Sequence, residues 1–200
     1  MAILRAGLPV IAFASLAKWE AWLAAQPGSS PGVWMKLAKK TAGGVTVSRQ
    51  EAIDGALCHG WIDGQLNSFD DSYWLVRFTP RKKSSKWSQL NCTRVEKLIA
   101  QGRMSSAGLR EVDAAKADGR WQAAYAPQSK ASVPDDLMQA LDAMPKARRF
   151  FDELDSANRY AILYRLHTAK TEKTRAARLE KFIAMLARGE TIHPRKIAAR

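Results

Sequence analysis

Residues Glu51–Asn91 read EAIDGALCHGWIDGQLNSFDDSYWLVRFTPRKKSSKWSQLN, and this stretch decides the fold that the sequence predicts. It begins as a short helix, which Gly60 ends in the usual C-terminal way. Two segments with the composition of β-strands follow, at 61–68 and 73–79, with a pair of aspartates at the turn between them. A β-hairpin is therefore expected at the centre of the N-terminal part of the chain.

Alternation of side chains along the two strands sorts the hairpin residues onto two faces. With Asp70 near the centre of the turn, Asp63 is expected opposite Arg77. The face expected to pack in the core comprises Ile62, Leu66, Trp74, Val76 and Phe78. The other face is expected to be aromatic and polar together, and comprises Trp61, Asp63, Gln65, Tyr73 and Arg77. Such a composition is unusual for a plain solvent-exposed face, which makes it a candidate binding surface.

A basic segment follows the hairpin, because Pro80 cannot donate to a strand ladder and ends the second strand. Between Arg77 and Lys86 there are five Lys or Arg residues and no acidic residue. Guanidinium groups and serine hydroxyls bind phosphate or carboxylate oxygens, and Trp87 offers a ring on which a base can stack. The alternative is a solvated loop followed by a helix whose Trp87 packs in the core.

The predicted ligand-binding residues come from the polar hairpin face, the basic segment and the helix after it: Asp63, Gln65, Arg77, Arg81, Ser84, Lys86, Trp87 and Asn91. Within this set, Asp63 is expected to orient Arg77 or Arg81 for an anionic ligand. The alternative is an enzyme that acts on a small anionic substrate, with Asp63 as acid or base in a cleft beside Arg81.

No motif of a known catalytic, nucleotide-binding or metal site is present. Adjacent Cys58 and His59 point about 100° apart on a helix, so they do not face each other as a nucleophile and its base. A set of His59, Asp63 and one of the turn aspartates lacks the spacing of metal ligands. We therefore predict no catalytic residue, no cofactor and no metal. Whether the protein is an enzyme stays open, and the sequence favours a protein that is not one.

The whole chain is strongly basic, with 32 Lys and Arg against 19 Asp and Glu in 200 residues, a formal net charge of +13. Such a surface attracts nucleic acid, anionic lipid or an acidic protein. Between Lys146 and Arg200 there are 14 basic and 6 acidic residues, which either form solvated helix faces or extend a surface for polyanions. A basic protein without any such partner is the alternative.

The cysteines and the apolar segments indicate the compartment. Two cysteines outside any disulfide pattern favour a reducing cytoplasm. The apolar run after Arg5 is similar to a secretory signal, but it contains Pro9 and continues into a helical pattern, so a folded segment is predicted. No run reaches the ~20 apolar residues of a membrane span. A cytoplasmic protein without a membrane span is expected.

Elements on either side of the hairpin complete the predicted fold, which is α+β. Strands are expected at 9–13 and 33–39, and a short return strand at 41–47. N-terminal helices are expected at 15–25, 48–60, 88–100 and 106–118. C-terminal helices are expected to end near 143, to include 150–154, to begin at 155 or 156, and to run from 171 to 188. The helices of residues 1–125 would pack on a small antiparallel sheet, and residues 126–200 would form an all-helical unit, as separate domains or as one fused domain.

Several segments resemble the YdeI/OmpD-associated (bacteriocin-protection) family. In the N-terminal part these are GVWMKLAKK, SRQEAIDGALCHGWIDGQ, RFTPRKKSSKWSQLN and a helix ending in QGRM. In the C-terminal part they are DGRWQAAY, VPDDLMQAL and TRAARLEKFIAML, so the resemblance extends from Val10 to Gly189. It implies a soluble bacterial protein with an α+β unit and a helical unit, connected with envelope stress or resistance, and it implies no catalytic residues.

The sequence thus predicts a non-catalytic module that binds an anionic partner, either nucleic acid or a small ligand, in stress or envelope resistance. Besides the enzyme described above, a second alternative is an adaptor that docks a partner protein on its C-terminal helices. An exposed apolar patch of several hundred Å² on those helices would favour the adaptor.

Overall fold

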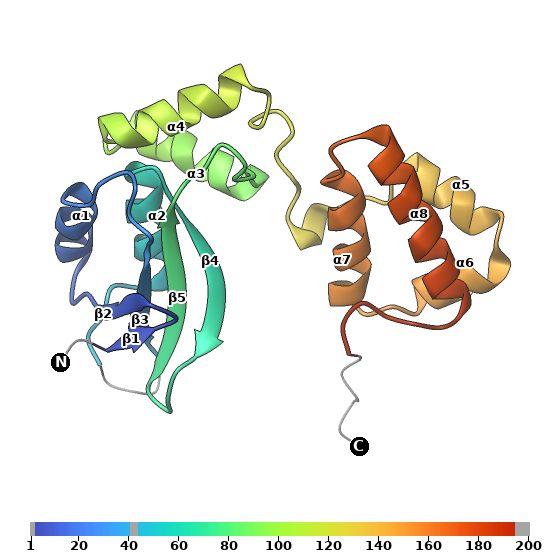
Figure 1. The fold of residues 1–200 in the computed structure, drawn as a ribbon, viewed down its shortest axis with the longest axis horizontal. Coiled ribbons are helices and arrows are strands. Elements are labelled where there is room, and N and C mark those ends of the chain that lie inside the picture. The colour runs from blue at the N-terminus through green and yellow to red at the C-terminus, as the bar shows by residue number, and fades with distance from the viewer. Residues whose placement is uncertain (1–2, 41–43, 195–200) are drawn as a thin grey trace. The chain divides into compact units, whose positions relative to one another are not determined.

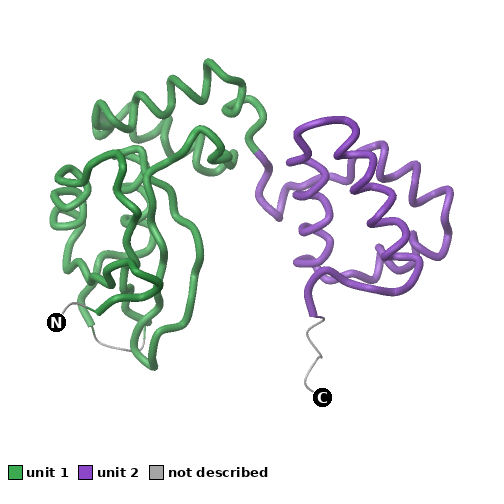
Figure 2. Tube along the Cα trace, in the orientation of Figure 1, with its two compact units in different colours: residues 1–124 green, residues 125–200 purple. Residues whose placement is uncertain are grey.

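A computed structural model describes residues 3–40 and 44–194 of the chain. The chain divides into two units, residues 1–124 and residues 125–200, here named unit 1 and unit 2 (Figure 2). The return strand expected at 41–47 falls partly on residues 41–43, and the predicted basic C-terminal region includes residues 195–200. Both of these ranges lie outside the described residues, and the described residues 44–47 are not a strand.

Unit 1 combines a sheet with helices, as predicted (Figure 1). Its strands are β1 Leu4–Arg5, β2 Leu8–Ala12, β3 Val33–Ala38, β4 Trp61–Ser68 and β5 Tyr73–Pro80. Its helices are α1 Leu16–Ala24, α2 Arg49–Cys58, α3 Gln89–Ala100 and α4 Ser106–Ala117. Serine side chains cap the N-termini of all four helices, and Ser48 forms a complete capping box with Glu51. The sequence signals for these helix starts are confirmed.

The five strands form one sheet in the order β1-β2-β3-β5-β4. The pair β2–β3 is parallel, whereas the pairs β1–β2, β3–β5 and β4–β5 are antiparallel. The prediction of a purely antiparallel sheet was therefore wrong. The reason lies in the connection, because α1 carries the chain back across the sheet between β2 and β3, and a helical crossover places the next strand parallel to the first.

One face of the sheet, the inner face, packs against α1 and α2. Its core is an aromatic cluster around Trp19, which is fully buried and stacks on Trp22 at 5.4 Å between ring centroids. The Trp19 indole Nε1 donates to the Ala52 carbonyl at 3.0 Å. A Cβ on Gly55 would meet the Trp19 ring at 2.9 Å, so glycine lets the two helices approach closely. The opposite, outer face has a small apolar cluster of Leu8, Trp34 and Leu75.

The hairpin register differs from the predicted one. Asp63 pairs with Phe78 and Ser68 with Trp74, and a bulge lies between Asp63 and Leu66. The turn is therefore centred on Asp71, because the Asp70 carboxylate accepts from the backbone N–H groups two and three residues later, at 2.8 Å each. That one-residue change, together with the bulge, reassigns the side chains to different faces.

The new register moves some residues to the other face, whereas Leu66 and Trp74 stay on the predicted face of Val76 and are not covered there. Trp61, expected on the polar face, is 4% exposed and lies in the inner core. Leu66 and Trp74, expected in the core, are 49% and 42% exposed. Val76 and Phe78 do pack in the inner core as predicted. Paired residues of an antiparallel ladder share a face, so Asp63 points to the side of Phe78, and Arg77 points to the outer face.

The last two helices of unit 1 cover the end of the hairpin. Trp87 is 2% exposed and packs with Val95 of α3 and Val112 of α4 in a second apolar core. Trp87 therefore packs in the core, as the alternative interpretation of the basic segment expected. A Cβ on Gly108 would meet the Cys58 carbonyl oxygen at 2.2 Å, so α4 crosses the end of α2 in close contact.

Unit 2 consists of helices: η1 Gln128–Lys130, α5 Asp135–Asp142, α6 Pro145–Asp152, α7 Ser156–His167 and α8 Glu172–Ala187. Its core includes Leu137, Phe151 and Leu166. The Asp136 carboxylate takes two hydrogen bonds from the Arg175 guanidinium, at 2.7 and 2.8 Å, which holds α5 to α8. In the described part of the chain, no helix combines the length and apolar character that crossing a membrane requires.

Candidate anion-binding site

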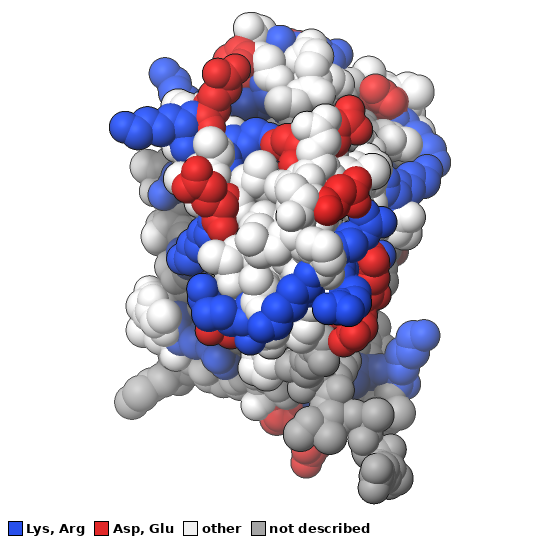
Figure 3. All heavy atoms as spheres, turned by 90° about the vertical axis from the view of Figure 1, so that its right-hand side faces the viewer, with Lys and Arg blue, Asp and Glu red and all other residues white. Residues whose placement is uncertain are grey.

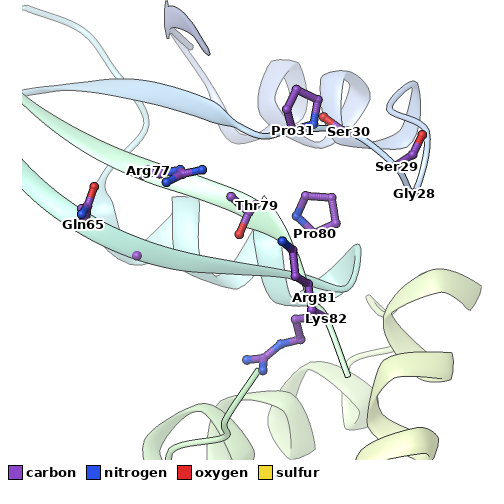
Figure 4. A pocket seen from close by; sticks show the side chains of 11 residues that line it. Gly28, Ser29, Ser30, Pro31, Gln65, Arg77, Thr79, Pro80, Arg81 and Lys82 are labelled. Atoms are coloured by element: carbon purple, nitrogen blue, oxygen red, sulfur yellow. The ribbon is translucent and has the colours of Figure 1, made fainter. Parts of the chain in front are cut away.

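A cavity of about 530 Å³ lies on the outer face where β5 ends, here named the outer cavity. Loop residues 28–31 form one wall, and the hairpin with the first residues of the basic segment forms the other (Figure 4). The loop approaches β5 closely at Gly32, where φ is +109° and a Cβ would meet the Phe78 carbonyl oxygen at 2.4 Å. Only glycine fits this backbone conformation and this contact.

Arg77 brings a guanidinium to this cavity from the middle of β5. It pairs across the sheet with Trp34 of β3, on the outer face. The Arg77 Nε atom is buried and has no hydrogen-bond partner, and the same is true of the Trp34 indole Nε1. Buried N–H groups are almost always hydrogen-bonded in folded proteins, so two orphaned donors side by side on one face are unusual.

Arg81 is the more deeply placed of the two guanidinium groups, with only 6% of the residue exposed. Its Cζ atom lies 3.5 Å from the centroid of the Trp87 ring, and Nη1 donates to the Lys86 carbonyl at 3.3 Å. Its Nε and Nη2 atoms have no hydrogen-bond partner. The ring therefore supports the guanidinium plane, while two of its donors are unused.

The pKa of Arg81 reflects the burial of its guanidinium group. Burial lowers the pKa of Arg81 to about 10, and the nearby charge of Glu111 opposes that shift. The side chain is still cationic at neutral pH. Within residues 3–40 and 44–194, Arg81 forms no ion pair. A buried charge without a paired counter-ion is costly, and an anion in the outer cavity would offset that cost.

The basic segment itself is a closed turn that fixes the position of Arg81. The Lys82 N–H donates to the Ser85 hydroxyl at 2.9 Å, and the Ser85 N–H donates to the Lys82 carbonyl at 2.8 Å. Arg120, at the end of α4, donates to the Ser85 carbonyl at 3.2 Å. These contacts hold the segment against unit 1, so the Arg81 side chain has a defined environment.

The structure brings together three of the eight predicted ligand-binding residues, since Gln65, Arg77 and Arg81 all line the outer cavity. Trp87 lies directly under Arg81. Ser84 and Lys86 are exposed on the turn, outside the cavity lining. Asn91 is half-buried at the start of α3, where its N–H donates to the N-cap Ser88 hydroxyl.

The predicted role of Asp63 toward Arg77 was wrong. Asp63 lies on the inner face, where its carboxylate is 3.8 Å from the Arg49 guanidinium at the start of α2. Arg77 lies on the outer face of the same sheet, so the sheet separates the two side chains. Toward Arg81, Asp63 contributes only a weak charge interaction, the last of the contributions to that pKa.

Sequence reasoning missed several residues of this region. The hydroxyls of Ser29, Ser30 and Thr79 and the Lys82 ammonium also line the outer cavity. The sequence signal for the loop was its composition, PGSSPG. Small residues allow the loop to approach another segment closely, but they do not indicate which segment that is. The pairing of β3 with β5 decides that, and pairing between distant strands is not encoded locally.

A second cavity of about 420 Å³ also contacts Arg81 and is lined by His59, Arg110 and Glu111, among others. His59 was set aside in the sequence because of its position beside Cys58. Burial lowers the pKa of His59, which keeps its imidazole neutral at pH 7. Over the described ranges, no group of three His, Cys, Asp or Glu residues could hold a metal ion.

On one face of the molecule, acidic side chains lie among the Lys and Arg side chains and interrupt the positive charge (Figure 3). Several basic residues of unit 2 are paired, for example Arg148 with Asp152 at 3.1 Å and Arg188 with Glu190 at 2.8 Å. The cations of the outer cavity differ from these, because no carboxylate lines that cavity.

Comparison with known proteins adds the family. Residues 11–111, half of the chain, match a family model described as a domain of unknown function (DUF8412), so the chain belongs to that family. Residues 130–189 match the model described as Bacteriocin-protection, YdeI or OmpD-Associated. The region of the chain that matches the YdeI/OmpD-associated model lies in unit 2. No curated protein and no solved structure matches the chain significantly.

This outcome confirms the family predicted from the sequence and refines its extent. The C-terminal segments that resembled the family, VPDDLMQAL and TRAARLEKFIAML, lie within residues 130–189. The N-terminal segments that contain GWIDG and FTPR lie instead in the domain of unknown function. The outer cavity, with Arg77 and Arg81, therefore belongs to that N-terminal domain.

Proposed function

We propose that unit 1 is a non-catalytic binding module whose outer cavity holds a small anionic ligand by its carboxylate or phosphate oxygens. The observation that carries this proposal is a cavity lined by Arg77, Arg81 and Lys82, with no carboxylate among its described lining residues. The Nε atom of Arg77 and the Nε and Nη2 atoms of Arg81 are buried without hydrogen-bond partners. Guanidinium groups bind such oxygens through charge-assisted hydrogen bonds, which are the strongest available to a side chain.

The other residues that line the cavity favour an anionic ligand over a neutral one. Lys82 adds an ammonium, and Ser29 and Thr79 add hydroxyls that can donate to further oxygens. An anion here would neutralise part of a buried charge, so binding and folding stability should be coupled. The family description names bacteriocin protection, and we place this binding in a stress or envelope-resistance pathway of the cell.

The test is a thermal-unfolding titration of the full chain with inorganic phosphate, and in parallel with citrate, in Tris–HCl at pH 7.5. Both probes should raise the melting temperature in a saturable manner. In Arg77→Gln and Arg81→Met the affinity should fall at least about tenfold, because each removes a charge-assisted contact. Lys18→Gln is the matched control, since it removes one charge at an exposed position on α1 and should leave the affinity unchanged.

Two results would overturn the proposal. One is the absence of a saturable shift with either probe up to 50 mM, about 50 times the Kd of 1 mM that corresponds to a binding free energy of about −4 kcal/mol. The other is an equal loss in Lys18→Gln, which would make the effect one of overall charge. Circular dichroism of each variant establishes that it is folded before its affinity is compared.

A second candidate, an enzyme acting on a small anionic substrate, is favoured by one observation. His59, Glu111 and Arg81 line the neighbouring cavity, and an imidazole and a carboxylate are the side chains that most often transfer protons. The discriminating measurement is ³¹P and ¹H NMR of phosphate monoesters and hydroxy acids incubated with the protein. Turnover that His59→Gln abolishes would favour the enzyme, and recovery of every compound unchanged would favour the binding module.

A further inference from the structure

A different feature lies at the turn end of the hairpin, on the inner face beyond the cover of α2. Trp74 of β5 and Leu66 of β4 are 42% and 49% exposed there. They line a cavity of about 600 Å³ together with the end of β3 and residues 44 and 46–49. Large apolar side chains side by side at the surface are a feature of binding surfaces, and this one is separate from the outer cavity, which lies on the opposite face.

Cations surround the exposed tryptophan. The Lys39 Nζ atom lies 4.9 Å from the centroid of the Trp74 ring, and it donates to the Asp70 carbonyl at 2.6 Å. Lys40 and Arg49 also line the cavity, and no acidic residue does. The Arg49 guanidinium is 3.8 Å from Asp63, which is a long contact for a side chain that is 57% exposed. The Lys39 ammonium has three N–H donors, so it can donate to a ligand besides Asp70, and Lys40 and Arg49 add two more cations to the cavity.

We infer that this surface binds single-stranded nucleic acid, with one base against Trp74 and Leu66 and the neighbouring phosphates against Lys39, Lys40 and Arg49. An aromatic ring within a cationic groove is the arrangement by which proteins bind unpaired strands, because every base has a face that stacks. A duplex hides those faces. The net charge of +13 favours a polyanion over a free nucleotide, since phosphates beyond the cavity also interact with the protein.

The experiment measures fluorescence anisotropy of a labelled twelve-residue oligothymidylate against the full chain at several salt concentrations. Binding should weaken linearly in log–log form as salt rises. Trp74→Ala should weaken it roughly five- to hundredfold through lost stacking, and Trp74→Phe should retain part of the affinity. Lys39→Gln should reduce the salt slope by about 0.7, the value for one phosphate contact on a single strand.

Matched controls separate this surface from general charge and from the outer cavity. Leu90→Ala removes an equally exposed apolar side chain from α3, and Lys18→Gln removes one exposed charge from α1; both should bind the oligonucleotide as the parent does. Arg81→Met should also bind it normally, because Arg81 belongs to the site of the proposed function. A negative phosphate titration would therefore contradict only the proposed function. A negative oligonucleotide titration would contradict only the present inference.

Three outcomes would overturn the inference. The first is no binding of the oligonucleotide at 50 mM salt. The second is a Trp74→Ala variant that is folded and binds no worse than Leu90→Ala. The third is equal affinity for a duplex of the same length or for thymidine monophosphate, either of which would show that the surface does not select an unpaired strand.

Discussion

Within the described ranges, two polar residues are buried, and they behave in opposite ways: Asn158 in unit 2 and Arg81 in unit 1. The Asn158 amide is fully used. Its Nδ2 donates to the Asp155 carboxylate at 3.2 Å and to the His193 carbonyl at 3.2 Å, and its Oδ1 accepts from the His193 N–H at 2.8 Å. Arg81 has one long hydrogen bond, and two of its donors have no partner.

The difference separates a polar group whose partners the protein supplies from one whose donors are left without partners. A buried group with all its partners in place fixes the elements it joins, and Asn158 ties α7 to the segment after α8. A buried group with free donors lowers the stability of the empty protein. Asn158 is therefore a structural residue, and the proposed anion site would supply the counter-charge that the described residues do not give Arg81.

The largest expected effect tests the structural side of this comparison. Asn158→Ala removes the side-chain hydrogen bonds to Asp155 and His193 and should lower the free energy of unfolding of unit 2 by about 2–3 kcal/mol. Urea denaturation followed by circular dichroism measures it. Gln139→Ala, at an exposed position of α5, is the control and should change stability by less than about 0.5 kcal/mol. Equal effects of the two substitutions would remove the distinction drawn for Asn158.

Arg81→Met in unit 1 should change the free energy of unfolding by a smaller amount and in the opposite direction. Arg81→Met keeps an apolar stem over Trp87 and removes a buried charge that has no partner. In buffer without a multivalent anion it should leave stability unchanged or raise it by about 1 kcal/mol. The same urea denaturation measures this. A loss of more than about 2 kcal/mol would mean that Arg81 is a structural residue of the same kind as Asn158.

The elements of this fold are largely legible in the sequence because their signals are local. A cap residue and an apolar period define α1 between Ser15 and Ala25, and the helix predicted at 171–188 is observed as α8. The direction of pairing is not local. The sheet is mixed because β2 and β3 lie on either side of a helix, and no property of either strand alone indicates that they are neighbours.

Part of the candidate site could likewise be predicted from local sequence, and part could not. Arg77 and Arg81 could be predicted because a cluster of basic residues without acidic neighbours is apparent in the amino-acid sequence. The error over Asp63 came from one residue of register, which the Asp70 side chain sets by closing the turn around Asp71. Alternation amplifies such an error, because a change of one residue exchanges the two faces of a strand.

The smallest expected effect is a change in the reactivity of the Cys92 thiol, whose pKa depends on the charge of Arg81. Burial raises the pKa of Cys92 to about 11, and the positive charge of Arg81 opposes that shift. Burial also raises the pKa of Cys58 to about 11, with Arg103 as the opposing charge. A thiol whose pKa is higher in the folded state contributes stability that is present below pH 9 and is lost as the pH rises through 11.

Arg81→Met should therefore raise the pKa of Cys92 further and slow its alkylation by iodoacetamide between pH 8 and 10, roughly two- to threefold. Cys58 is the internal control in the same sample, because its charge partners are elsewhere. Peptide mapping by mass spectrometry follows both rates at once. Asn158→Ala should alter neither rate. An unchanged ratio of the two rates in Arg81→Met would mean that the Arg81 charge is already neutralised within the protein, and the case for a ligand in the outer cavity would lose its electrostatic basis.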